Sequence, residues 1–128
     1  MRTALRVLCG LNAVFQVIVG LLCSVAPAVA DKVFELTQTG PSVFALTRMF
    51  GGLLFGSGLL SGLVARDPDR NRDLPILLAA ACIVNVSADM MVVANGEMPF
   101  GNLAVGVILQ VVIVALALGH VSKRRATV

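Results

Sequence analysis

Four long apolar stretches, separated by short polar segments, dominate the pattern of hydrophobic and polar positions. They cover roughly residues 4–29, 42–65, 75–94 and 101–121. About 20 helical residues are enough to cross ~30 Å of hydrocarbon, so each stretch has the length of a transmembrane helix. Prolines mark the breaks, among them Pro27, Pro41 and Pro75. The pattern predicts an all-α, polytopic integral membrane protein with a single domain, residues 1–128.

The composition supports a chain surrounded by lipid. It is 58% hydrophobic and 13% charged, with a mean hydropathy of +0.94. A soluble domain carries about 25% charged residues. The start of the chain also resembles a secretory signal, with Arg2 and Arg6 before an apolar run that ends in "APAVA". Because this run exceeds the ~7–15 apolar residues of a signal, we expect a retained first helix.

The basic residues are distributed unevenly between the two sides of the predicted helices. One side carries eight: Arg2, Arg6, Arg66, Arg70, Arg72, Lys123, Arg124 and Arg125. The loop 30–41 on the other side carries one, Lys32. The positive-inside rule predicts that both termini are cytoplasmic, as in a multi-pass protein of a bacterial inner membrane. The net charge of +3 then reflects topology, and no nucleic-acid partner is expected.

Short connections between the helices predict their arrangement. Loops of this length make sequential helices antiparallel neighbours. The expected fold is therefore an antiparallel four-transmembrane-helix bundle. The longest connection, 30–41, has room for a short interfacial helix outside the bundle.

Polar positions inside the apolar stretches recur at three- and four-residue steps. The first stretch has Cys9, Asn12, Gln16, Gly20 and Cys23 on one stripe; the third has Cys82, Asn85 and Asp89; the fourth has Gly106 and Gln110. Such spacing places side chains on one helical face. In lipid, polar side chains are expected to face other helices. We therefore expect the amides and Asp89 to form a polar network inside the bundle, either structural or ligand-binding.

Two charged residues lie more than one helical turn inside the predicted spans. Arg48 is ~9 Å inside the second helix and Asp89 is ~8–9 Å inside the third, at 1.5 Å per residue from the same side of the membrane. Each would neutralise the other, and an isolated charge at this depth costs at least ~2.5–3.5 kcal/mol. We predict an Arg48–Asp89 contact with Asn85 one turn deeper. It either fixes helix register or forms a pocket for a headgroup, quinone, small anion or proton.

The second stretch is rich in glycine. Gly51, Gly52, Gly56, Gly58 and Gly62 fall on one broad face together with Arg48. Small residues at four-residue spacing let two helix backbones approach closely. We interpret this face as a packing face inside the bundle in preference to a dimer face.

The sequence lacks the residue patterns of the common catalytic and metal sites. There is no C-x-x-C motif, and the three cysteines lie in apolar runs, as expected of small buried hydrophobic side chains. His120 is the single histidine, and we expect it in solvent at a helix end. Asp31, Glu35 and Glu97 are likewise expected as solvated loop charges. No catalytic residue, metal or cofactor is assigned, so the chain is expected not to be an enzyme.

Two segments carry a family resemblance. "LTRMFGGLLFGSGLLSG" followed by "NVSADMMVVANGEMP" on four spans resembles the DoxX-like group of small bacterial membrane proteins. The resemblance implies a four-helix bundle. For a few members it also implies a membrane subunit of a quinone-linked oxidoreductase. Of the residues discussed above, only Arg48 and Asp89 carry over, as pocket residues.

Two functions from different classes follow from these patterns. The first is an accessory or scaffold subunit that packs against other membrane subunits, or against further copies of itself, within the lipid bilayer. The alternative is a binding or transport protein for a small polar, lipid-headgroup or quinone-like ligand, with Arg48, Asp89 and Asn85 as its pocket. A membrane enzyme acting on lipid-like substrates is a third hypothesis, for which the sequence provides no acid–base pair.

Overall fold

A computed structural model describes residues 1–37, 40–71 and 73–127, and the regular elements in these segments are all helices. They are α1 (Arg2–Val25), α2 (Pro27–Val33), α3 (Pro41–Arg66), α4 (Asp73–Ala94), the short 3-10 helix η1 (Phe100–Asn102) and α5 (Ala104–Ala126). Helices α1, α3, α4 and α5 are long and apolar enough to cross a membrane. This confirms the predicted all-α class, and the four long apolar helices agree with a multi-pass membrane protein. Arg72, counted above among the basic residues, lies outside the described residues.

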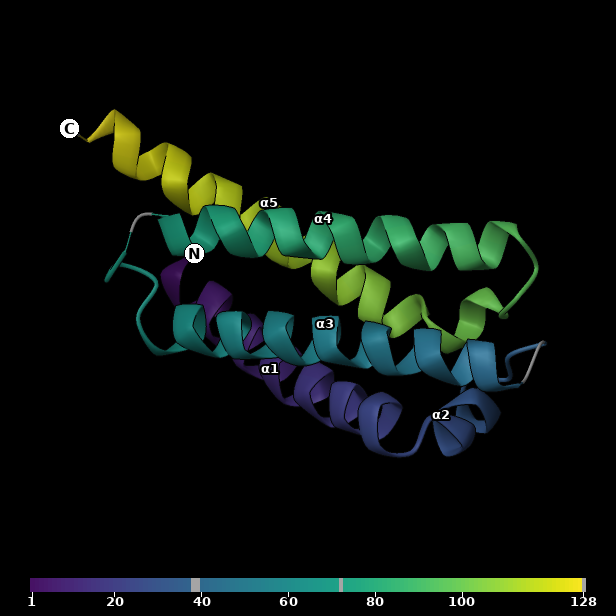
Figure 1. Ribbon diagram of the computed structural model, residues 1–128. Coiled ribbons are helices and arrows are strands. Elements are labelled where there is room, and N and C mark those ends of the chain that lie inside the picture. Colours follow the sequence, from purple (N-terminus) through teal and green to yellow (C-terminus); the bar gives the residue numbers. More distant parts are fainter. Residues whose placement is uncertain (38–39, 72, 128) are drawn as a thin grey trace.

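The four long helices lie side by side (Figure 1). Both termini and the α3–α4 connection lie at one end of the molecule, which we call the terminal end. Helix α2 and the connection from α4 to α5 lie at the other end, which we call the α2 end (Figure 1). Helix α1 packs mainly against α3, and α4 packs mainly against α5. The molecule therefore consists of two helix pairs with a looser seam between them.

The first predicted span is divided in the structure. Helix α1 ends at Val25, and Ala26 leaves the helical region with φ −131° and ψ 65°. Pro27 then starts α2, which is a favoured position for proline because its missing N–H would have no partner there. The short helix expected within 30–41 is therefore found earlier, at Pro27–Val33. At the other terminus, α5 continues to Ala126, five residues beyond the predicted end at 121.

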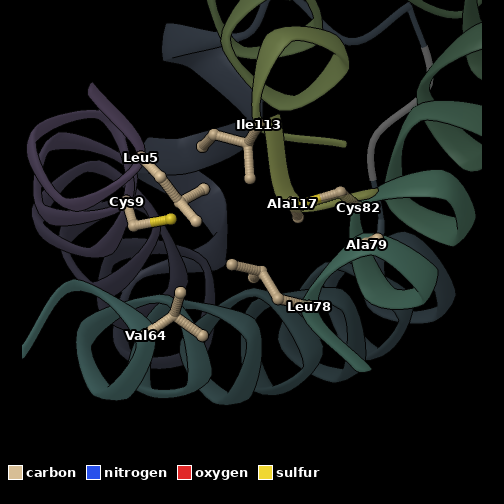
Figure 2. Close-up of a cluster of buried hydrophobic side chains, with 8 residues drawn as sticks. All are labelled: Leu5, Cys9, Val64, Leu78, Ala79, Cys82, Ile113 and Ala117. Atoms are coloured by element: carbon tan, nitrogen blue, oxygen red, sulfur yellow. The ribbon is translucent and has the colours of Figure 1, made fainter. Parts of the chain in front are cut away.

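The half of the bundle near the terminal end contains a closely packed apolar core. Its members are Leu5, Cys9, Val64, Leu78, Ala79, Cys82, Ile113 and Ala117. Figure 2 shows these side chains converging from α1, α3, α4 and α5. Cys9 and Cys82 are 0% exposed, which confirms that they act as small buried hydrophobic groups. In lipid, contacts of this kind stabilise a bundle through van der Waals packing.

Three glycines hold α1 and α3 at close approach. A Cβ atom placed on Gly51 would lie 2.7 Å from the carbonyl oxygen of Gly20, and one placed on Gly20 would lie 2.7 Å from the carbonyl oxygen of Gly51. A Cβ on Gly58 would lie 3.0 Å from the backbone nitrogen of Val17. No larger residue fits these positions without separating the two helices. The small-residue face of α3 is therefore a face toward α1.

The other glycines of α3 differ from this pattern. A Cβ on Gly62 would make only an ordinary contact, 3.8 Å from the Cβ of Ala13. Gly52 and Gly56 are exposed, and a Cβ on either would meet nothing within 4 Å. The expectation that all five glycines pack inside the bundle therefore has to be corrected for these two. They lie far enough around the helix axis from Gly51 to face the surrounding lipid.

Candidate functional site

Two hydrogen bonds between helices form a polar layer next to the apolar core. Asn12 Nδ2 donates to Ser61 Oγ at 3.0 Å, joining α1 to α3. Asn85 Nδ2 donates to Ser57 Oγ at 3.3 Å, joining α4 to α3. Both asparagines are buried, at 0% and 5% exposure, so their predicted interior position is confirmed. These two amides link helices, and neither lines the pocket described next.

A pocket of about 570 Å³ lies between this layer and the α2 end. Its volume is within the ~300–1,000 Å³ typical of small-molecule sites. All five α-helices contribute to its wall. The polar side chains that line it are Gln16, Asp31, Thr47, Asp89, Glu97, Asn102 and Gln110. The rest of the wall is largely apolar, including Phe15, Phe34, Phe50 and Leu54.

Several buried polar atoms in the pocket wall have no hydrogen-bond partner among the described residues. They are Nε2 and Oε1 of Gln16, Oε1 of Gln110 and Oδ2 of Asp31. The three residues are only 1%, 3% and 2% exposed. Leaving such an atom unpaired costs about 1–3 kcal/mol. Buried polar groups normally have a partner, so this arrangement is the one expected where a bound molecule completes the hydrogen bonds.

Asp89 lies in the same wall, as the stripe on the third apolar stretch predicts. It is 8% exposed and lines the pocket from α4, one turn closer to the α2 end than Asn85. In the described segments, it makes no ion pair within 4.0 Å. Its carboxylate therefore lies against the pocket space without a protein cation beside it.

The predicted contact between Arg48 and Asp89 is not formed. Arg48 is exposed and does not line the pocket. The α3 face that meets α4 is marked by Ser57, which bonds to Asn85. Ser57 follows Arg48 by nine residues, and nine steps of ~100° place the two on opposite sides of the helix. The long Arg48 side chain can instead extend along the helix toward the nearer membrane surface.

Asp31 is a pocket residue that the sequence reasoning missed. It was expected in solvent, but it is 2% exposed and accepts a hydrogen bond of 2.9 Å from Thr47 Oγ1. Helix α2 packs against α1 and α3 and so brings this carboxylate into the pocket wall. Pro27, Ala30 and Asp31 are the buried residues of α2, so its buried face starts at the proline. The proline in "APAVAD" was the available signal for a new helix carrying Asp31 inward.

Glu97 also departs from the expectation of a solvated loop charge. It is half-buried and lines the pocket from the α4–α5 connection. Its backbone oxygen accepts a hydrogen bond from the Thr37 backbone N–H at 3.1 Å. Glu35 is exposed, as predicted.

A separate charged cluster joins the elements of the terminal end. The Asp69 carboxylate lies 3.0 Å from Arg2 Nε, 3.3 Å from Arg124 Nη2 and 3.0 Å from His120 Nε2. His120 is 9% exposed, so its expected position in solvent is corrected by this contact. The cluster joins α1, the α3–α4 connection and α5. It lies at the opposite end from the pocket and serves to hold the helix ends together.

Comparison with known proteins identifies no relative of this chain. No protein-family model matches it, and no curated protein or solved structure is detectably similar to it. The function has to be inferred from the pocket itself.

Proposed function

We propose that the chain is a multi-pass membrane protein that binds a small amphiphilic molecule in the pocket at the α2 end. The observation that carries this proposal is the set of unpaired buried polar atoms on Gln16, Asp31 and Gln110, which line a space of about 570 Å³. The polar part of the ligand would lie against these side chains and Asp89. Its apolar part would lie along the phenylalanine and leucine wall.

The rim of the pocket supports an amphiphilic ligand in particular. Leu46, Met49 and Leu53 belong to its lining and are nevertheless 65%, 70% and 65% exposed. In a membrane, these exposed apolar side chains of α3 face lipid. A ligand that is already dissolved in the bilayer can therefore reach the pocket from the side, without crossing the polar connections at the α2 end.

The orientation in the membrane is part of the proposal. Eight basic residues near the termini and the α3–α4 connection, against Lys32 alone in the 30–41 segment, support an antiparallel bundle with both termini in the cytoplasm of a bacterium. The pocket then lies in the outer half of the inner membrane. The proposed role is binding without chemical conversion, and membership of the DoxX-like group remains a separate hypothesis.

Native mass spectrometry of gently solubilised protein tests the binding proposal. Ala88 lines the pocket, and Ala88→Phe fills part of it; Ala80 lies on the same helix, exposed and outside the lining, so Ala80→Phe is the matched control. We expect a non-covalent small-molecule adduct on the wild type and on Ala80→Phe, and its loss from Ala88→Phe. Equal helical content by circular dichroism establishes that both variants fold. No adduct on any form, or the same adduct on all three, would contradict the proposal.

A second function, as an accessory or scaffold subunit, is favoured by one observation. Gly52 and Gly56 are four positions apart on the exposed side of α3, where a Cβ atom on either would meet nothing within 4 Å. A partner transmembrane helix can approach closely at such a pair of glycines. Replacing both glycines by leucine should then shift the protein from a complex to a smaller species on native gels. Unchanged migration of the double variant counts against this function.

A further inference from the structure

The charged side chains that line the pocket all carry the same sign. Asp31 contributes a carboxylate from α2, Asp89 from α4 and Glu97 from the α4–α5 connection. Among the described residues of the lining there is no lysine, arginine or histidine. The pocket is therefore electronegative, although the chain as a whole has a net charge of +3.

Within residues 1–37, 40–71 and 73–127, no basic side chain forms an ion pair with these carboxylates. Every ion pair within 4.0 Å in the described segments involves Asp67 or Asp69, at the terminal end. Asp31 and Asp89 are nevertheless 2% and 8% exposed, so solvent screens them little. Buried charges are normally paired, because an uncompensated one is costly outside water. A positive charge brought by a ligand would supply the partner that these carboxylates lack among the described residues.

The apolar wall of the pocket suits a cation with a hydrophobic body. Phe15, Phe34 and Phe50 line it, which is half of the six phenylalanines in the chain. The faces of aromatic rings attract cations within ~6 Å, most strongly where water is excluded. Aromatic rings and carboxylates in one pocket are the combination that binds an ammonium group attached to an apolar structure.

We propose that the occupant of the pocket is a hydrophobic cation, a molecule that carries an ammonium or phosphonium group on an apolar body. This inference rests on the proposed binding function and gives its ligand a chemical class. The positive group lies against the carboxylates of the pocket wall, and the unpaired amide oxygens of Gln16 and Gln110 in the same wall can accept hydrogen bonds from an N–H of the ligand. Ligands that carry a negative charge without a positive group are disfavoured by the carboxylates.

Two probes of similar shape and opposite charge test the inference. Tetraphenylphosphonium and tetraphenylborate differ mainly in the sign of their charge. Binding of each is measured by equilibrium dialysis against the full chain in dodecyl maltoside, a detergent without charge, with the Ala88→Phe protein as the background. We expect saturable binding of the phosphonium at one site per chain and no saturable binding of the borate.

Neutral variants of the carboxylates locate the bound charge. Asp89→Asn and Asp31→Asn keep the side-chain shape, and each should weaken phosphonium binding at least about tenfold, which corresponds to about 1.4 kcal/mol. Asp73→Asn is the matched control, because Asp73 is exposed at the terminal end of α4 and outside the pocket. It should bind the phosphonium as the wild type does. Should one pocket variant fail to fold, the other carries the test.

The outcomes separate this inference from the binding proposal beneath it. One outcome is that the wild type binds the borate and not the phosphonium, and that Ala88→Phe abolishes the borate binding. This result would overturn the inference of a cationic ligand and would still support binding in the pocket. Phosphonium binding that neither Asp31→Asn nor Asp89→Asn weakens would also overturn it. If neither probe binds and no adduct accompanies the purified protein, both proposals fail. Competition by added phosphatidylethanolamine would support the inference and assign the cation to a lipid headgroup, whereas phosphonium binding that this lipid leaves unchanged would support a free hydrophobic amine.

Discussion

The close contact between α1 and α3 predicts that alanine has opposite effects at two adjacent glycines. A Cβ atom on Gly51 would lie 2.7 Å from the Gly20 carbonyl oxygen and 2.6 Å from Ser24 Oγ, whereas an ordinary van der Waals contact begins at 3.4 Å. The two backbones would have to separate by several tenths of an ångström. A Cβ atom on Gly52 would meet nothing within 4 Å.

The difference between the two variants isolates the cost of the contact. Overpacking of this kind destabilises a protein by about 1–3 kcal/mol. The gain in helix propensity from glycine to alanine, about 1 kcal/mol, is common to both positions and cancels. Gly51→Ala should therefore have a free energy of unfolding about 1–3 kcal/mol below that of Gly52→Ala.

Unfolding in mixed micelles of dodecyl maltoside and dodecyl sulfate measures this difference. The chain has no tryptophan or tyrosine, so far-ultraviolet circular dichroism is the suitable signal. The midpoint for Gly52→Ala should equal or exceed that of the wild type, and the midpoint for Gly51→Ala should be lower. Identical midpoints for the two variants would show that the α1–α3 interface tolerates a methyl group, and the packing described here would be refuted.

Three further predictions concern polar side chains outside the pocket. Asp69→Asn should lower the free energy of unfolding by about 1 kcal/mol or more, because it weakens the partly exposed contacts that join three elements at the terminal end. Thermal unfolding followed by circular dichroism measures this change, and a free energy of unfolding equal to that of Asp73→Asn would contradict it. Ser61→Ala should lower the free energy of unfolding by roughly 0.6 kcal/mol, a typical value for a hydrogen bond between membrane helices, because Asn12 Nδ2 loses its acceptor. The same dodecyl sulfate titration measures this change, and an unfolding midpoint at or above that of the wild type would contradict the hydrogen bond. Arg48→Gln should leave both the unfolding midpoint and phosphonium binding unchanged, since Arg48 is exposed and outside the pocket lining; a loss of binding in equilibrium dialysis would restore the idea of an arginine in the site.

Helical periodicity explains why the interior polar residues are predictable. Side chains at three- and four-residue steps share one face in any α-helix. When this face is polar, the surrounding lipid favours turning it toward the other helices. Four residues follow this rule and are at most 8% exposed, as their stripes indicate: Gln16, Asn85, Asp89 and Gln110. The number of long helices follows in the same way from the lengths of the apolar stretches.

Periodicity does not determine which neighbour a face meets, and this is why Arg48 was misplaced. The glycine face of α3 turns toward α1, which puts Ser57 toward α4 and Arg48 away from it. Asp31 escaped prediction for a different reason. It lies on a helix of only seven residues, for which Pro27 was the one signal, and the direction of the buried face of this helix depends on how the chain turns after Val25. Both errors concern tertiary contacts, which a single sequence specifies only through the packing of the whole bundle.

The most direct test of the binding pocket is a crystal structure of the protein extracted in a mild detergent, without removal of its bound molecules. The proposed function predicts non-protein density in the pocket within hydrogen-bonding distance of Gln16, Gln110 or Asp31, the residues whose buried polar atoms lack partners. A pocket closed by its own side chains, with the Gln16 and Gln110 amides bonded to other protein groups and no additional density, would contradict it.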